Sequence, residues 1–288
     1  MNAKESVMHK LGKNTISVSD IASQFWCERQ MELNYMYGKR YTEAMATGSK
    51  IHAELEEVAH ERLDAKPKSF LDSLYKSAYE DYFVIKKLRE IGIGRELKIF
   101  GSVNGFALVG QIDELLLRNG KVTVVENKTV VAQSPPGEAF VKPHRVQVLV
   151  YIKMLDDIRN GRYTYNNFSA SYELDKMNLS KEFSSRLRDL GLSEEIINIK
   201  NVFRRMFDSI SQIPEVDESA EIHYIDKETH AQAYSVSVNY NKDEIRNILI
   251  YAMRYWNGER EAKPVDEKEK WKCNSCRFFG KECKVWWH

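Results

Sequence analysis

Hydrophobic and polar residues recur along the chain with two different periods, and the change of period separates helical segments from strands. After Ser17, apolar residues recur with roughly the period of a helix, at Ile21, at Phe25 and Trp26, and then at Met31 and Leu33. This spacing predicts a helix that Ser17 caps. Similar patterns predict a helix that starts at Gly48 and others over 70–88, 143–157 and 180–212, with Pro143 in a first turn and a last helix ending at Asn257-Gly258.

Four other segments alternate with a period of two and are rich in β-branched or aromatic residues, which predicts strands. They cover 95–100, 106–118, 121–129 and 234–240, and the last is expected to be half-buried. Asn119-Gly120 separates the second from the third. This dipeptide is the strongest short-range signal for a two-residue β-hairpin.

The hairpin fixes a register that brings two carboxylates together. If Arg118 pairs with Lys121, the numbers of paired residues add to 239, so Asp113 lies opposite Glu126. Two like charges about 5 Å apart on one sheet face destabilise the pairing. A divalent cation between them removes the conflict, and carboxylate oxygens suit Mg²⁺ or Mn²⁺.

The same register places Lys128 opposite Gln111 and on the face of Glu126. Val122 and Val124 share that face, which implies partial burial. A metal-bound carboxylate pair beside a lysine suits phosphodiester hydrolysis, because the metal activates water and the lysine stabilises developing charge. An exposed strand face with ordinary charges is the alternative, and a β-bulge would break the pairing.

Four cysteines form an asymmetric set, with three close together at the C-terminal end of the chain. Cys273, Cys276 and Cys283 are spaced C-x2-C-x6-C, and Cys27 is the only other cysteine. Four thiolates suit a structural zinc or a [4Fe–4S] cluster. Zinc usually takes two C-x2–4-C pairs, so the lone Cys27 favours the cluster, with four unrelated thiols as the alternative.

Composition narrows the classes of protein that fit. The 288 residues are 43% hydrophobic, enough for a sizeable core, and the net charge is +1. Residues 268–288 hold six basic and two acidic residues together with several aromatics, which serve either nucleic-acid binding or the shielding of a cluster. No apolar run approaches a membrane span, and residues 1–17 do not form a signal peptide.

Beyond these arguments, the sequence resembles a known group of nucleases. Asp113 followed by Glu126-Asn127-Lys128 resembles the D…(D/E)-x-K motif of the PD-(D/E)XK superfamily. His52 stands where RecB-like members carry a metal-binding histidine, and Gln147 and Tyr151 reproduce their Q-x3-Y motif. The i, i+4 spacing of that pair puts both on one helix face.

One cysteine far from three others resembles the iron–sulfur nucleases of the RecB-like branch, and further segments resemble the exonuclease V family over about residues 17–288. These segments are Ser17-Val18-Ser19-Asp20, Trp26-Cys27-Glu28, Val109-Gly110-Gln111-Ile112-Asp113-Glu114, Tyr255-Trp256-Asn257-Gly258-Glu259-Arg260 and Trp271-Lys272-Cys273. The resemblance implies an α/β fold: a PD-(D/E)XK restriction-endonuclease-like core, with a mixed central sheet flanked by helices, helical additions and a C-terminal iron–sulfur region.

The implied activity is metal-dependent exonucleolytic hydrolysis of single-stranded DNA, in repair or replication. The resemblance implies that Mg²⁺ or Mn²⁺ is held by His52, Asp113 and Glu126, and that a [4Fe–4S] cluster is held by Cys27, Cys273, Cys276 and Cys283. Asp113, Glu126, Lys128, Gln147 and Tyr151 are the expected catalytic set. Expected DNA contacts are Arg29, Lys142 and Arg145, with the basic residues of 186–205 as further candidates. Glu96 is either another acidic ligand or part of an exposed ion pair.

The expected organisation has six parts. They are an N-terminal tail (1–16), a helical region with Cys27 and His52 (17–94), the catalytic core (95–175), a helical insertion (176–215), a returning strand and helix of the core (216–262) and an iron–sulfur tail that closes onto Cys27 (263–288).

Two other functions stay open at this point: a CRISPR-associated RecB-like nuclease that trims spacer precursors, and a non-catalytic iron–sulfur module that binds DNA or senses redox state. The expected partners are single-stranded DNA and a single-strand-binding protein, with no membrane, for a monomer. We expect an intracellular location: the cytoplasm in a prokaryote, the nucleus or mitochondrion in a eukaryote.

Overall fold

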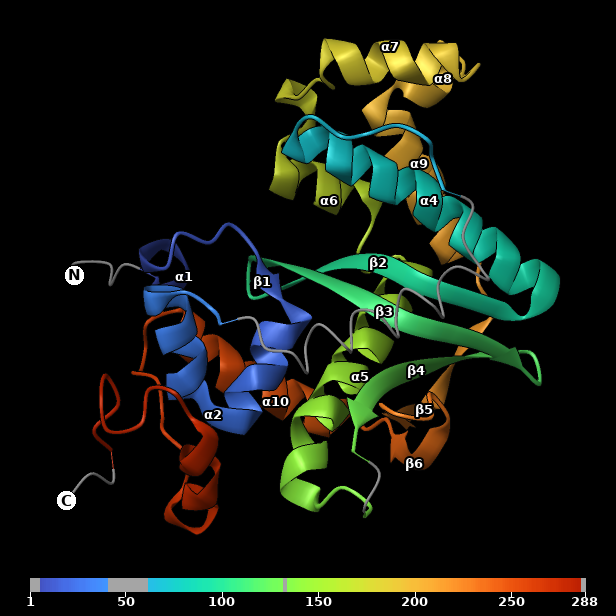
Figure 1. The fold of residues 1–288 in the computed structure, drawn as a ribbon. Helices are drawn as coiled ribbons and strands as arrows, with labels where there is room; N and C mark the ends of the chain where they lie inside the picture. The colour runs from blue at the N-terminus through green and yellow to red at the C-terminus, as the bar shows by residue number, and fades with distance from the viewer. Residues whose placement is uncertain (1–5, 41–61, 132–133, 286–288) are drawn as a thin grey trace.

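The protein folds around one mixed β-sheet with helices on both faces, as the computed structural model shows for residues 6–40, 62–131 and 134–285 (Figure 1). This confirms the expected α/β class with a mixed central sheet flanked by helices. None of the helices in these ranges is long and apolar enough to cross a membrane. The division of the chain into six parts stays a prediction.

The sheet has six strands, and β3 pairs with three of them, β1, β2 and β4. The strands are β1 (Ile16–Ser17), β2 (Ile93–Val103), β3 (Phe106–Arg118), β4 (Lys121–Val130), β5 (Glu215–Asp226) and β6 (Gln232–Asn239). Strands β2 and β4 are antiparallel to β3, β5 is parallel to β4, and β6 is antiparallel to β5. The short β1 pairs parallel with β3.

Two long helices cover opposite faces of β2. They are α4 (Phe70–Ile91) and α5 (Glu138–Arg159). A Cβ at Gly94 would lie 3.0 Å from Val84 of α4, and one at Gly101 would lie 3.2 Å from Met154 of α5. Because 94 and 101 differ by an odd number, their side-chain positions face opposite ways. The two glycines therefore let one helix approach each face.

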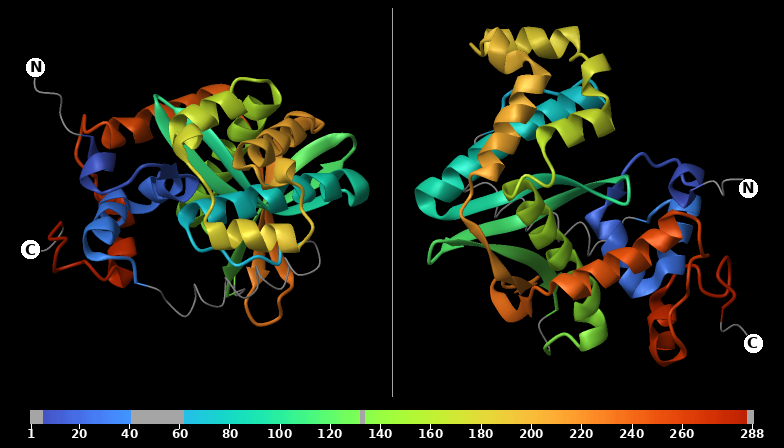
Figure 2. Two further views of the ribbon diagram at one scale, coloured as in Figure 1. Left: turned by 90° about the horizontal axis from the view of Figure 1, so that it is seen from above. Right: turned by 180° about the vertical axis from the view of Figure 1, so that it is seen from behind.

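A layer of helices lies over the α4 side of the sheet (Figures 1 and 2). Phe168 joins this layer to the sheet, because its ring centroid lies 4.6 Å from that of Phe100 in β2 and 4.5 Å from that of Phe203. The layer confirms the helical character expected of 180–212. Beside α4 it contains α6 (Tyr165–Tyr172), α7 (Lys181–Asp189), α8 (Glu194–Ile197) and α9 (Ile199–Ser211).

On the other side, helix α2 (Val18–Tyr37), helix α10 (Lys242–Trp256) and the C-terminal segment pack together (Figures 1 and 2). The predicted cap is confirmed, since the Ser17 hydroxyl accepts a hydrogen bond from the Asp20 N–H and the Asp20 carboxylate accepts one from the Ser17 N–H. The short helices α1 (Val7–Lys10) and η2 (Glu267–Ser275) complete this side.

Buried Glu28 ties this group together from the middle of α2. Its carboxylate, 1% exposed, pairs with Arg260, accepts a hydrogen bond from Gln24 and accepts another from the Lys263 N–H at 2.8 Å. The Arg29 N–H donates to the Lys263 carbonyl at 2.9 Å. These contacts fasten the C-terminal segment to α2.

Most predicted elements are confirmed, and two differ. Helix α5 begins at Glu138, so Pro143 lies in its second turn, where a proline removes one backbone hydrogen bond and crowds the carbonyl of Ala139. Strand β5 was not predicted. Its pairing with β4 slips between Val122 and Val124, where three residues of β5 (217–219) stand opposite Thr123 alone, so that β5 has two extra residues. The helix predicted to start at Gly48 lies outside the described residues.

Candidate active site

The hairpin of β3 and β4 has the predicted register. Asn119 and Gly120 both have positive φ, as a two-residue type I′ turn requires. The paired residues run from Arg118–Lys121 to Glu114–Val125, and each pair adds to 239. At the next position the backbone ladder stops, and the Asp113 carboxylate accepts a hydrogen bond from the Asn127 N–H at 2.8 Å. Asp113 thus reaches across to the strand segment that carries Glu126.

Beyond Asp113 the two strands separate. Strand β2 occupies one edge of β3, so β1 and β4 share the other: β4 pairs with 114–118, and β1 pairs with Leu108 and Val109. The expectation that Lys128 lies opposite Gln111 is therefore wrong, because that part of β4 has left β3. The separation leaves the site of Asp113, Glu126 and Lys128 at an opening in the sheet.

Glu126 and Lys128 form an ion pair at this opening. Glu126 is 1% exposed, whereas the Lys128 side chain is 27% exposed. Burial disfavours the charged amine, but the negative charges of Glu126 and Asp113 outweigh it and raise the pKa of Lys128. Lys128 therefore carries a positive charge at neutral pH, with its ammonium group held beside the carboxylates.

Gln147 and Tyr151 lie on the face of α5 that packs against this opening. Gln147 donates a hydrogen bond to the Tyr151 hydroxyl at 3.2 Å, and both side chains are buried. Burial raises the pKa of Tyr151 well above its usual value, and the negative charge of Glu126 raises it further. The phenol therefore stays protonated and acts as a hydrogen-bonding group rather than a base.

Gly110 allows Tyr151 to reach the sheet. A Cβ on Gly110 would lie 2.5 Å from Cε1 of Tyr151 and 2.8 Å from Cγ2 of Val18, closer than carbon atoms approach each other. The hydroxyl of Tyr151 also receives a hydrogen bond from the backbone of Gln111. Position 110 therefore carries a glycine because any side chain there would collide with the ring of Tyr151.

The sequence argument missed His144, three residues before Gln147 on the same helix face. Its Nδ1 lies 3.1 Å from the Tyr224 hydroxyl. Burial and the positive charge of Lys128 lower the pKa of His144 to about 3, so the ring is neutral at physiological pH. The i, i+3 spacing from Gln147 was the available signal, since it places both side chains toward the same opening.

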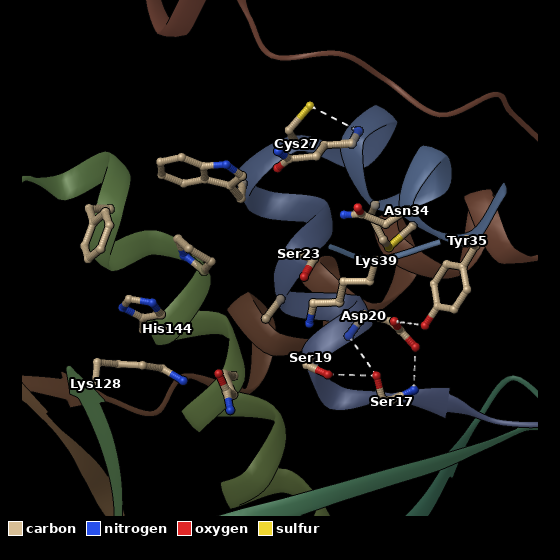
Figure 3. A pocket seen from close by; sticks show the side chains of 17 residues that line it. Ser17, Ser19, Asp20, Ser23, Cys27, Asn34, Tyr35, Lys39, Lys128 and His144 are labelled. Carbon is tan, nitrogen blue, oxygen red and sulfur yellow. Dashed lines mark hydrogen bonds between the residues drawn. The ribbon is translucent and has the colours of Figure 1, made fainter. Parts of the chain in front are cut away.

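A cavity of about 470 Å³ connects these residues with α2 (Figure 3). Lys128 and His144 lie on one side, and Ser19, Ser23 and Lys39 lie across from them. The lining also includes Gln147 and Cys27. The cavity therefore runs from the candidate catalytic residues toward the first cysteine.

Three basic residues were predicted to contact DNA, and each of them lies beside another group of the protein. Arg145 pairs with Glu244 of α10 through two hydrogen bonds of 2.9 and 2.8 Å, which joins α5 to α10. Arg29 pairs with Glu32, and the exposed Lys142 ammonium lies 5.8 Å from the Phe25 ring centroid. Their roles in DNA binding stay predictions.

Three further candidates complete the set. Glu96 accepts a hydrogen bond from the Gln111 side chain at 2.8 Å and has a positive φ of 55°. Within 186–205, Arg186 pairs with Asp64, and Arg188 pairs with Glu194. His52 lies outside the described residues.

The four cysteines line one small cavity between α2 and the C-terminal segment, as their proposed grouping requires: Cys27, Cys273, Cys276 and Cys283. Cys27 lies at a break in α2, with extended φ and ψ of −163° and 107°. In the described part of the chain, however, no three Cys, His, Asp or Glu side chains form a ready metal-binding group. A metal would have to draw the sulfur atoms together.

The environment of the cysteine sulfurs is largely apolar. Burial raises the pKa of the Cys27 thiol to about 11, and the neighbouring Cys276 adds to the effect. The Gln30 N–H donates a hydrogen bond to the Cys27 sulfur at 3.4 Å and opposes that shift. A metal that binds here must therefore displace protons, which makes binding pH-dependent.

Comparison with known proteins places the chain in a family. A family model described as "Exonuclease V - a 5' deoxyribonuclease" matches residues 7–122, 117–201 and 191–287. The chain belongs to the exonuclease V family. Exonuclease V of Danio rerio is 26% identical over 292 residues, which cover 95% of this chain and 71% of that protein. The family indicates a DNA exonuclease, which is a hydrolase that binds DNA.

Among solved structures, the crystal structure of SSO0001 aligns with a TM-score of 0.46 at 16% sequence identity. The alignment covers 92% of this chain and 84% of that one.

Proposed function

We propose that this member of the exonuclease V family is a metal-dependent exonuclease that hydrolyses single-stranded DNA from the 5′ end, in DNA repair or replication. The observation that carries the proposal is the opening between β3 and β4, where Asp113, Glu126 and Lys128 meet beside a cavity. The core is proposed to be of the PD-(D/E)XK type. The family description supplies the 5′ polarity.

The donor atoms at the opening fit Mg²⁺ or Mn²⁺. Asp113 and Glu126 offer carboxylate oxygens from adjacent strands, and these are the ligands that hard cations prefer. We propose that both residues hold the metal, together with His52. The chemistry that such a metal supplies when bound is activation of water and neutralisation of phosphate charge.

The protein's own residues then position the reacting groups. Lys128 is charged and directs its ammonium group to the nucleophilic water or to a non-bridging phosphoryl oxygen. The water oxygen bonds to phosphorus while a P–O ester bond breaks, and the leaving oxygen takes up a proton. Gln147 and the protonated Tyr151 form a fixed pair that holds α5 against β3 during this step.

A cleavage assay with both end labels tests the proposal. With Mg²⁺, a 5′-labelled single strand should release its label in short products, whereas a 3′-labelled strand shortens progressively. Circular single strands and blunt duplexes should resist. Asp113→Asn should abolish cleavage, while Glu90→Gln, which changes an exposed carboxylate on α4, should leave it unchanged. Cleavage that is independent of metal or of Asp113 contradicts the proposal.

We also propose that the four cysteines hold a structural [4Fe–4S] cluster. Four sulfur donors that line one cavity fit such a cluster, and hydrolysis needs no electron transfer, so its role is structural. In a chain-entropy model, a link that joins Cys27 to Cys273 restricts the unfolded chain and thereby stabilises the folded state by about 5 kcal/mol. Iron and zinc analysis of the anaerobically purified protein tests this. Colourless protein that contains zinc would exclude iron.

A further inference from the structure

One face of α5 forms a continuous wall of the cavity. Phe140, Pro143, His144 and Gln147 all line it, and their spacing of three, four and seven residues from Phe140 puts them on one helix face. The centroids of the Phe140 and His144 rings lie 5.4 Å apart. The wall therefore leads from an aromatic ring at the start of α5 to the glutamine beside the candidate catalytic residues.

Helix α2 forms the facing wall, mostly with small or polar side chains, and contributes the rings of Trp26 and Tyr35. Ser19, Ser23, Trp26, Gln30 and Asn34 recur every three or four residues and line the cavity. The Trp26 ring lies 6.1 Å from that of Phe140, at an interplanar angle of 90°. Two perpendicular rings make a corner that can hold a flat group by its face and by its edge.

The charges around the cavity suit a phosphate. Lys128 and Lys39 contribute positive charge to its described lining. Asp20, an acidic residue of that lining, is 6% exposed and already bonded to Lys13 and Tyr35. The cavity therefore offers ammonium groups, hydroxyls and amides to a ligand, together with aromatic surface.

Phe140 is the accessible part of that aromatic surface. Its side chain is 40% exposed, although its ring also contacts those of Trp26 and His144. One face of Trp26 is covered by the Lys272 ammonium, 4.4 Å from its ring centroid. A volume of about 470 Å³ lies within the range of small-ligand sites and suits an unstacked nucleotide, whereas the bases of a duplex are already stacked and paired.

We infer that Phe140, supported by Trp26, stacks on one base of the DNA strand when the adjacent phosphate lies at Lys128. The base must be unpaired to reach the ring, so this contact selects single-stranded over double-stranded DNA. The inference rests on the proposed function, and it names the residues that determine its substrate.

Binding of labelled oligonucleotides to the Asp113→Asn protein tests the inference, because this substitution is expected to prevent degradation. Added Phe140→Ala should weaken binding of single strands about 5- to 150-fold, the loss of one base–aromatic stack. Phe140→Tyr should retain binding. Phe70→Ala, which removes a ring that is 69% exposed on α4, serves as the matched control and should change nothing.

An abasic scan separates stacking from an indirect effect. With Phe140 present, replacing a single base by an abasic site should weaken binding at one position, and with Phe140→Ala the same replacement there should cost little. Equal losses in both proteins would overturn the inference, as would unchanged binding by Phe140→Ala. Unfolding midpoints in urea confirm that the variants are folded. Failure of the proposed function is distinct, because it would appear as cleavage that does not depend on Asp113.

Discussion

Gly110→Ala tests whether the contact between Tyr151 and β3 positions the site. The new methyl carbon would lie 2.5 Å from Cε1 of Tyr151, whereas ordinary contact begins near 3.4 Å, so the ring must retreat by about 0.9 Å. Overpacking of this kind costs about 1–3 kcal/mol of the free energy of unfolding. The retreat also strains the hydrogen bonds from Gln147 and from the Gln111 backbone to the phenol. A displacement near 1 Å can slow catalysis by about 10²-fold.

Urea unfolding and the rate of single-strand cleavage measure the two effects of Gly110→Ala. Gly137→Ser is the matched control, because a Cβ at Gly137 meets nothing within 4 Å and serine is a good N-cap. It should stay within about 0.5 kcal/mol of the wild type. In a Tyr151→Ala background the cost of Gly110→Ala should shrink, leaving only the contact with Val18. Wild-type stability and rate in Gly110→Ala would refute the reasoning.

Three further perturbations address the rest of the molecule. Glu28→Gln should lower the free energy of unfolding by about 3–5 kcal/mol, because it leaves the guanidinium of Arg260 without its buried charged partner. Urea unfolding measures this loss. A loss below about 1 kcal/mol would contradict the prediction. The pKa of His144 lies near 3 in the folded protein and near 6.5 when unfolded, so its contribution to stability should be complete above pH 6.5 and lost as the pH falls toward 3. His144→Asn should remove that part of the pH dependence. If the wild type and His144→Asn gave superimposable curves of the free energy of unfolding against pH, this role of His144 would be excluded. Lys128→Met should reduce the cleavage rate at least about 10²-fold at any Mg²⁺ concentration, whereas rescue by excess Mg²⁺ would assign Lys128 to metal binding instead.

The central hairpin was predictable because its information is local. Asn119-Gly120 sets the turn, and the turn sets the register as far as Glu114. The separation of the strands beyond that point was not predictable from the same rule. It depends on β1, about ninety residues earlier in the chain, which takes the edge of β3 that β4 leaves. Long-range competition for a strand edge leaves no periodic signal in either strand.

The same contrast holds for side chains. Gln147 and Tyr151 could be singled out from the sequence because they form a spaced pair, and the cysteines because their residue type is rare in this chain. His144 is a single histidine in a helix, and its significance comes from Tyr224, eighty residues away. Arg145 was predicted to contact DNA, which stays a prediction, and the structure adds that it pairs with Glu244. Charge alone does not show whether a basic side chain already has a partner.

The cavity of the candidate active site and the cavity of the cysteines share a wall. Trp26, Cys27 and Gln30 line both, and Cys27 lies where α2 breaks, so the geometry at this residue orients the helix segments on either side. The Gln30 side chain also donates a hydrogen bond to the Cys276 sulfur at 3.5 Å. Asp113 and Glu126 belong to the sheet, and the described lining of neither cavity includes them. A change at the cysteine centre therefore reaches Trp26, which we propose supports the base-stacking ring of Phe140, before it reaches the carboxylates, so the cluster that we propose would act on substrate binding more directly than on hydrolysis.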